Sequence, residues 1–134
     1  MAALTADRDT PRRAVTTFTD PVAAGAVIHA GALVMLDADG YAVPAATATG
    51  LTPRGRAAEA VTGGGADGDV TVRVERGCFR WANSSGADEI TRAHIGAAAY
   101  AVDDQTVAAT DGTGTRSACG TIRDVDAQGV WVEV

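Results

Sequence analysis

The sequence predicts a mainly β protein: a small, barrel-like single domain with one short helix and an extended N-terminal arm. Three observations lead to this prediction. Apolar and polar residues alternate with a period of two in several short segments, as in strands that bury one face. Glycine and short polar residues interrupt these segments about every eight to twelve positions. Only residues 88–95 carry the start and stop signals of a helix.

Length and composition fit one domain with a thin core. The chain has 134 residues, and its 46% of apolar residues are mostly Ala and Val, with two each of Phe, Trp and Tyr. A chain of this length normally forms a single core. In such a core each buried aromatic residue matters, because cutting a buried Phe or Trp to Ala costs about 3–5 kcal/mol.

The charge and the apolar pattern limit the partners. The formal net charge is −6, and every basic residue is Arg. The chain therefore lacks the broad positive field that attracts nucleic acid, and we expect no nucleic-acid partner. No apolar run approaches the length of about 20 residues that spans a bilayer, and the N-terminus lacks the apolar stretch of a signal peptide. We expect a soluble protein made in the cytoplasm, with no membrane partner.

The first twenty residues differ from the rest of the chain. Small and charged residues dominate residues 1–20, which we interpret as a flexible N-terminal arm, and residues 21–134 as a β-rich domain. Two interpretations of the arm remain open. It is either a frayed terminus or a segment that orders on an acidic or strand-edge surface of a partner. In the second case the candidate contact residues are Arg8, Arg12, Arg13 and Phe18.

Residues 33–36 and 41–43 are predicted strands of a hairpin. The residues between them read Asp-Ala-Asp-Gly, which is typical of a tight turn. The same letters resemble the start of a calcium loop. With Asp37 as the first ligand, however, the twelfth position holds Ala48 instead of the bidentate Glu, so the calcium interpretation fails.

Residues 70–83, VTVRVERGCFRWAN, are the segment around which we expect the rest of the chain to be organised. Large apolar residues occupy even positions before Gly77 and odd positions after it. One extra residue in a strand produces such a change, and glycine tolerates the bulge. We predict one long, bent strand, with Phe79 in the core and Trp81 near a subunit boundary.

The last third of the sequence predicts a helix and two hairpins. Asp88 is a candidate N-cap and Gly96 a candidate C-cap for a helix over residues 88–95. Two further segments, 99–109 and 117–134, each contain two strand patterns around a polar turn.

The closing hairpin places a tryptophan opposite a row of valines. Val130, Val132 and Val134 share one face of the predicted strand, and Trp131 lies on the other. A tryptophan in that position is covered either by another part of the fold or by another subunit. Trp81 and Trp131 are therefore candidate subunit-interface residues.

No segment carries a recognisable catalytic, cofactor-binding or metal site. His29 and His94 lack a second ligand at a zinc spacing, which favours surface or capping roles. The glycine-rich residues 63–69 lack the Gly-Lys-Ser/Thr ending of a phosphate loop. Asp103 and Asp104 fit a solvated turn better than acid/base chemistry. We expect a protein that is not an enzyme and has no cofactor.

Both cysteines are predicted to be buried free thiols, because the cytosol is reducing; they are Cys78 and Cys119.

Four motifs in the second half of the chain carry a resemblance to a known family. They are ANSSGADEIT, IGAAAYAVDDQTVA, DGTGTRSACG and GVWVEV, and the segment PVAAGAVIHAGALVMLDADGYAVPA matches more loosely. With these motifs the chain resembles the head decoration, or capsid cement, proteins of tailed bacteriophages and prophages. The motifs are turns and strands, and they contain no catalytic group.

The resemblance implies a fold, a partner and a location. The fold is a small β-barrel or β-tulip-like domain that binds the outer surface of an assembled icosahedral head, commonly as a homotrimer. Such proteins bridge neighbouring major capsid protein subunits and help the shell to resist the pressure of packaged DNA. On this basis we expect two partners, the major capsid protein and further copies of the same chain. The expected location is the outer capsid surface of the virion, after synthesis in the host cytoplasm.

A second class of function remains as an alternative. Trp131 next to Glu133 is compatible with a non-catalytic ligand- or carbohydrate-binding barrel, or with a tail-associated structural module. Glycan binding without affinity for capsids would favour that class.

Overall fold

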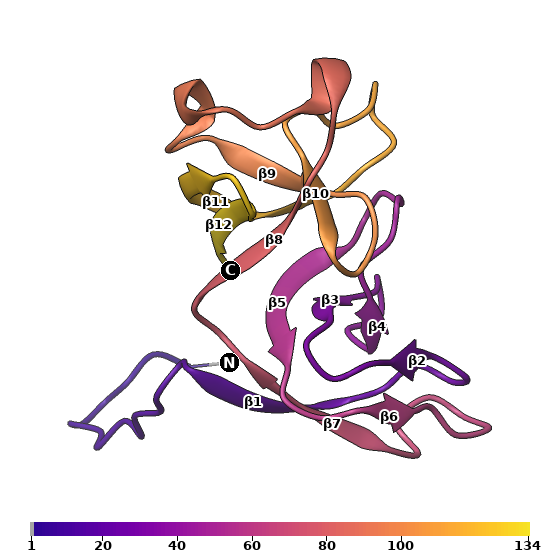
Figure 1. Ribbon diagram of the computed structural model, residues 1–134. Coiled ribbons are helices and arrows are strands. Elements are labelled where there is room, and N and C mark those ends of the chain that lie inside the picture. Colours follow the sequence, from indigo (N-terminus) through magenta and orange to yellow (C-terminus); the bar gives the residue numbers. More distant parts are fainter. Residues whose placement is uncertain (1) are drawn as a thin grey trace.

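The computed structural model describes residues 2–134 and is built from β-strands in two main layers (Figure 1). The first layer is a sheet with the strand order β1 (Thr17–Pro21), β7 (Thr71–Glu75), β5 (Thr52–Ala57), β3 (Leu33–Leu36) and β4 (Ala42–Pro44). A small two-stranded sheet beside it pairs β2 (Val27–Ile28) with β6 (Val61–Thr62). The second layer is a closed barrel with the order β10 (Thr106–Ala108), β8 (Cys78–Asn83), β12 (Gly129–Glu133), β11 (Ala118–Asp126) and β9 (Ala98–Ala101). The predicted mainly β, barrel-containing single domain is confirmed.

Strand β3 joins the two layers into one domain. Leu33 and Met35 belong to the apolar cluster of the barrel, whereas Val34 belongs to the cluster of the sheet. All three side chains are completely buried. Because successive side chains of a strand point to opposite faces, one short strand serves both cores.

The predicted hairpins form as the turn chemistry indicates. Strand pairs β3–β4, β9–β10 and β11–β12 are antiparallel. In the first turn the Asp37 carboxylate accepts hydrogen bonds from the backbone N–H groups of Asp39 and Tyr41. Asp often stabilises a turn in this way, by accepting hydrogen bonds from backbone N–H groups a few residues later. The Asp37 carboxylate is therefore used within the turn.

The prediction of one long bulged strand over residues 70–83 was wrong. The segment forms β7 in the sheet and β8 in the barrel. Val72 and Val74 are buried in the cluster of the sheet, whereas Trp81 is buried in that of the barrel. The change of phase at Gly77 arises because the chain passes from one core to the other and presents opposite faces to them. The pairing of β8 with β12 is regular from Cys78 to Trp81, so no inserted residue is needed.

The predicted helix over residues 88–95 is also wrong. Two 3₁₀ turns occupy this region, η1 (Gly86–Asp88) and η2 (Arg92–His94). Between them the side chain of Asn83 donates to the C=O of Ile90 and accepts from its N–H, at 2.8 and 2.9 Å. Ile90 lies outside both turns, and its side chain is buried in the barrel core. A continuous helix would break both contacts.

Candidate functional site

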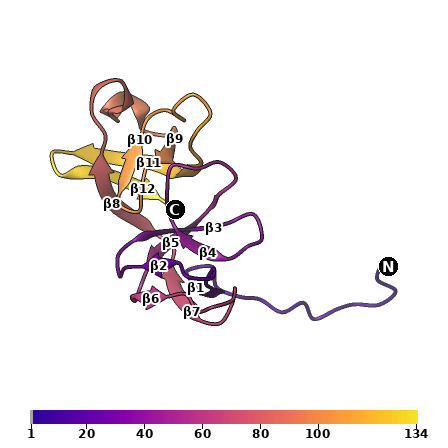
Figure 2. The ribbon, with the colours of Figure 1, turned by 90° about the vertical axis from the view of Figure 1, so that its right-hand side faces the viewer.

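The N-terminal arm consists of residues 2–16, which precede the edge strand β1. Residues 2–16 are all exposed, and they run away from the body of the molecule in an extended path (Figure 2). Leu4 and Val15 expose 73% and 64% of their surfaces. Residues 17–20 lie in β1, so the arm is shorter than the predicted residues 1–20.

The base of the arm is held by a cation–π and ion-pair cluster. Phe18 lies in β1, with the guanidinium of Arg54 at 3.5 Å from its ring centroid and that of Arg13 at 5.6 Å. Arg54 also makes a two-pronged ion pair with the buried Asp20, at 2.7 and 2.9 Å. Phe18 therefore belongs to the anchor of the arm, not to its free part.

The structure brings together only some of the predicted arm residues. Arg13 meets Phe18, whereas Arg8 and Arg12 are exposed and have no hydrogen bond or ion pair within the described residues. The anchor residue Arg54 lies in β5. Its partners Phe18 and Asp20 are more than thirty positions away, and no local pattern indicates that contact.

A second candidate surface is a groove of about 470 Å³ beside β8. Phe79, Arg80, Trp81 and Trp131 contribute to its walls. Trp81 is 5% exposed and belongs to the barrel core, whereas Phe79 is only partly buried. Trp81 thus lies in the core, whereas Phe79 packs against the core and is only partly covered. Trp81 presents almost no surface to a neighbour, and Trp131, which is half-buried, remains a candidate for a subunit contact.

Two arginines lie against the aromatic rings of the groove. The guanidinium of Arg56 is 4.5 Å from the centroid of Phe79, and that of Arg80 is 5.8 Å from the centroid of Trp131. The indole N–H of Trp131 donates to Asp126 at 2.9 Å. This bond, with backbone N–H donors, lowers the pKa of Asp126 below its ordinary value of 3.8. A guanidinium and the aromatic face beneath it attract each other, so these contacts hold both side chains in place. The groove therefore has a fixed and partly cationic lining.

The two cysteines are free, but only one is buried. Cys119 lies in the barrel core, where burial raises its thiol pKa to about 12. Cys78 is exposed at the groove, contrary to the prediction. Partial burial, followed by the charge of Glu133, raises the pKa of Cys78. Cys78 is on the outer face of β8, because the inner positions of that strand are the odd-numbered ones.

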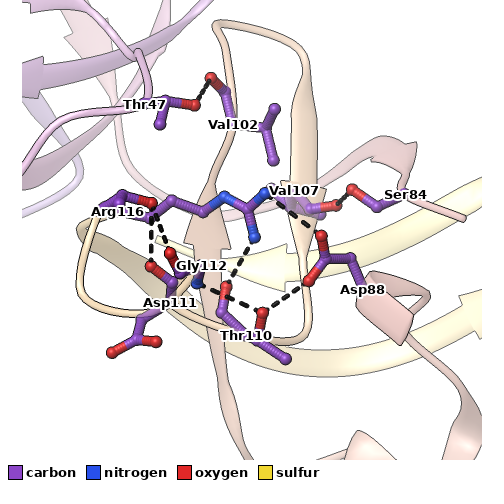
Figure 3. Close-up of polar contacts among 10 residues, drawn as sticks. Thr47, Ser84, Asp88, Val102, Val107, Thr110, Asp111, Gly112 and Arg116 are labelled. Carbon is purple, nitrogen blue, oxygen red and sulfur yellow. Dashed lines mark hydrogen bonds and ion pairs between the residues drawn. The ribbon is translucent and has the colours of Figure 1, made fainter. Parts of the chain in front are cut away.

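At the far end of the barrel, a polar network ties the loop of residues 110–116 to η1 (Figure 3). Asp88 accepts a hydrogen bond from Thr110 at 2.6 Å and one from Arg116 at 3.2 Å. Arg116 also donates to the backbone C=O of Thr110 at 3.1 Å. The bonds from Thr110 and Arg116 lower the pKa of Asp88. The network holds the loop against η1.

The titratable residues show structural roles. His94 caps η2, since its Nδ1 accepts the N–H of Thr91 at 2.9 Å, and His29 is exposed, so the predicted capping and surface roles are confirmed. Within residues 2–134 no three His, Cys, Asp or Glu side chains are grouped to hold a metal ion. In the same part of the chain, no helix has the length and apolarity to cross a membrane.

Comparisons with known proteins give no match. No protein-family model, no curated protein and no solved structure is significantly similar to the chain.

Proposed function

We propose that the protein is a head decoration, or capsid cement, protein of a tailed bacteriophage or prophage. In this proposal it binds the outer surface of the assembled head as a homotrimer and bridges neighbouring major capsid protein subunits. The protein stabilises the head through many identical contacts with capsid subunits, without catalysis. Several moderate contacts become strong when one oligomer touches several capsid subunits at once.

The observation that carries the proposal is the exposed arm on a rigid β body. Residues 2–16 extend from an edge strand, and the Phe18, Arg54 and Asp20 cluster anchors that strand to the sheet. The arm carries Arg8, Arg12 and Arg13 on a chain whose net charge is −6. A free, extended, basic segment next to a sheet edge can add to a strand or an acidic surface of a partner.

The surroundings of Trp131 favour a protein contact over sugar stacking. Its indole N–H is already bonded to Asp126, and Arg80 lies against its ring. A ring held in this way offers less open aromatic face than a carbohydrate platform requires. Half-buried tryptophans of this kind are common at protein interfaces.

Removal of the arm tests the proposal. The full chain and a variant without residues 2–16 would be mixed with empty heads of the corresponding phage or prophage, and head-bound protein measured by co-sedimentation. We expect the full chain to saturate the heads and the truncated variant to bind at least about tenfold more weakly, a loss of about 1.4 kcal/mol.

A charge-preserving variant provides the control. Arg8, Arg12 and Arg13 would be changed together to Lys, and in a second variant to Ser. We expect the Lys variant to retain most binding and the Ser variant to lose it. Undiminished binding by the truncated protein would reject the role of the arm, and no binding by the full chain would reject the function itself.

A further inference from the structure

Strand β8 pairs fully with only one neighbour along its first half. Its partner β12 runs antiparallel, with Phe79 opposite Val132 and Trp81 opposite Val130. The N–H of Val134 donates to the C=O of Gly77 at 2.9 Å, which identifies the odd-numbered residues as the hydrogen-bonded pairs of this ladder. Because such pairs alternate, the backbone N–H and C=O groups of Cys78 and Arg80 point away from β12.

The strand on the other side covers only the second half of β8. Strand β10 pairs with Ala82 and Asn83, and the N–H of Ala82 donates to Gln105. Before Cys78, the N–H of Arg76 is bonded to the C=O of Thr16. Between these two contacts, no backbone hydrogen bond within residues 2–134 occupies the outward N–H and C=O groups of Cys78 and Arg80. We call this short stretch the open edge of β8.

The open edge borders the groove described above. The lining residues include Cys78, Arg80 and Trp131, together with Gly31 and Arg56. The lining has two arginines and no carboxylate. An unpaired strand edge next to aromatic rings and fixed cations has the features of a site for strand addition.

Of the two arginines in the groove, Arg80 has its positive charge less fully neutralised by carboxylates of the chain than Arg56 does. Arg56 makes an ion pair with Glu75 at 2.8 Å, whereas the hydrogen-bond acceptor of Arg80 is the neutral amide of Gln128 at 3.3 Å. The charge of Arg80 acts on Asp126, but that carboxylate already accepts hydrogen bonds from Trp131 and from two backbone N–H groups. Arg80 is therefore free to take a carboxylate from another molecule.

We propose that the open edge of β8 is a docking site for an extended, acidic segment of a partner protein. The segment adds as a short strand whose backbone bonds the N–H and C=O groups of Cys78 and Arg80. A carboxylate on its outer face pairs with Arg80 beside Trp131, and an apolar side chain on its inner face contacts Phe79. This site is separate from the arm and does not rest on the proposed function.

A competing explanation assigns Arg80 a purely protective role. Charged residues on short strand edges prevent unwanted pairing between molecules. In that case the edge would reject extended segments of either charge. The two explanations predict opposite results when a strand-forming peptide is offered to the edge.

Cys78 allows the edge to be probed by disulfide tethering of the full-length protein. The probe is the mixed disulfide of β-mercaptoethanol with the peptide acetyl-Thr-Glu-Val-Cys-Thr-amide, in which Cys and Glu share one face at the spacing of Cys78 and Arg80. The Cys78 thiolate attacks the peptide sulfur of this disulfide and displaces β-mercaptoethanol, so the exchange needs no oxidant. Thiol–disulfide exchange in excess β-mercaptoethanol sets an equilibrium, so the captured fraction reports non-covalent fit. Cys119 does not compete, because it is buried and its thiol pKa is about 12. Captured protein is counted by intact mass spectrometry.

Two altered peptides separate charge from backbone pairing. In one, Lys replaces Glu, and in the other the backbone nitrogen of Glu is methylated. We expect the Glu peptide to be captured about tenfold more strongly than either, since a charge-assisted pair or a lost backbone bond changes binding by about 1.4 kcal/mol or more. Equal capture of the three peptides would overturn the proposal.

Two protein variants complete the test. Arg80→Glu should reverse the preference, so that the Lys peptide is captured better than the Glu peptide. Arg92→Glu is the matched control, because Arg92 is exposed and lies on η2, and it should keep the original order. Thermal melting of each variant verifies folding. If Arg80→Glu leaves the order unchanged, or if the unmodified chain forms a dimer that this substitution dissolves, the site does not serve an acidic partner segment.

Discussion

Two aromatic residues of β8, two positions apart, have different surroundings. Trp81 is 5% exposed and packs edge-on against Phe79, with ring centroids 6.3 Å apart. Its indole N–H is buried and has no hydrogen-bond partner among the described residues. Phe79 is covered by the guanidinium of Arg56 instead. Trp81 therefore contributes apolar packing to the barrel core but also carries an unsatisfied polar group.

This contrast predicts an unequal response to two substitutions. Trp81→Ala should lower the free energy of unfolding by about 3–5 kcal/mol, because it leaves a large cavity. Trp81→Phe should cost less than about 1.5 kcal/mol, since the lost volume is offset by removal of an unpaired N–H worth about 1–3 kcal/mol. Urea denaturation followed by far-UV circular dichroism measures both, with Trp131→Phe, at a half-buried position, as control. Equal costs for the two Trp81 variants would show that the N–H is satisfied.

At the residue scale, the sequence alone defines the charge of the candidate arm but not the surroundings of the aromatic residues. The basic character of the arm follows from Arg8, Arg12 and Arg13 themselves. The places of Phe79 and Trp81 could not be predicted from alternation alone. Alternation says that odd and even residues face opposite ways, but it does not say which core each face meets.

At the scale of elements, the region between β8 and β9 is shaped by one side chain. Asn83 bonds both backbone groups of Ile90, seven positions later, as a neighbouring strand would. The helix signals of Asp88 and Gly96 are genuine local preferences, but they compete with this clamp and with burial of Ile90. Two separate 3₁₀ turns result. The hairpins, in contrast, were predictable because their turns are encoded by adjacent residues.

The loop that follows β10 should respond to acid through Asp88. Its folded-state pKa is lowered by the bonds from Thr110 and Arg116, so its contribution to stability is present above its ordinary pKa of 3.8. That contribution is lost as the pH falls through the lower, folded-state pKa. We expect Asp88→Asn to melt below the wild type at neutral pH and to approach it below pH 3.8, as measured by calorimetry.

A neighbouring carboxylate provides the control for this acid effect. Asp111 lies in the same loop, but only its backbone C=O takes part in the network. Asp111→Asn should melt like the wild type at every pH. A gap between Asp88→Asn and the wild type that stays constant from neutral pH to below pH 3.8 would contradict the assigned role of Asp88.

At the scale of the whole molecule, the two layers depend on each other. Leu33 and Met35 fill the barrel core, and Val34 fills the core of the sheet, so loss of β3 would open both. Further bonds cross between the layers, from Leu33 N–H to the C=O of Asp104 and from Thr47 to the C=O of Val102. Strand β3 and these bonds tie the two apolar clusters together.

The shared strand predicts a single cooperative unfolding transition. Trp fluorescence reports on the barrel, and methyl NMR signals of Val72 and Val74 report on the sheet. Both probes should give the same urea midpoint in the wild type. Leu33→Ala should lower both midpoints together, at a cost of about 2–5 kcal/mol. If the sheet melted at a lower urea concentration than the barrel, the two layers would be separate folding units.

The sequence-based prediction captured the class of the molecule and missed its internal division. Period-two patterns and turn residues indicated one β-rich domain with a barrel, which is correct. The passage of residues 71–83 from sheet to barrel at Gly77 was read as a bulge. Both arrangements give the same apolar pattern, and only long-range pairing with β1 and β12 distinguishes them. Such pairing has no local signature in a single sequence.

The way in which β1 is attached has a mechanical consequence. Five residues of β1 pair in register with β7, and Arg54 of β5, the next strand beyond β7, contacts Phe18 and Asp20. A pull on the arm along the axis of β1 loads this whole ladder at once, so its hydrogen bonds must fail together. A pull across the strand opens them one after another, beginning at the bond from the N–H of Arg76 to the C=O of Thr16. The body would therefore hold a tensioned arm more firmly along the strand than across it.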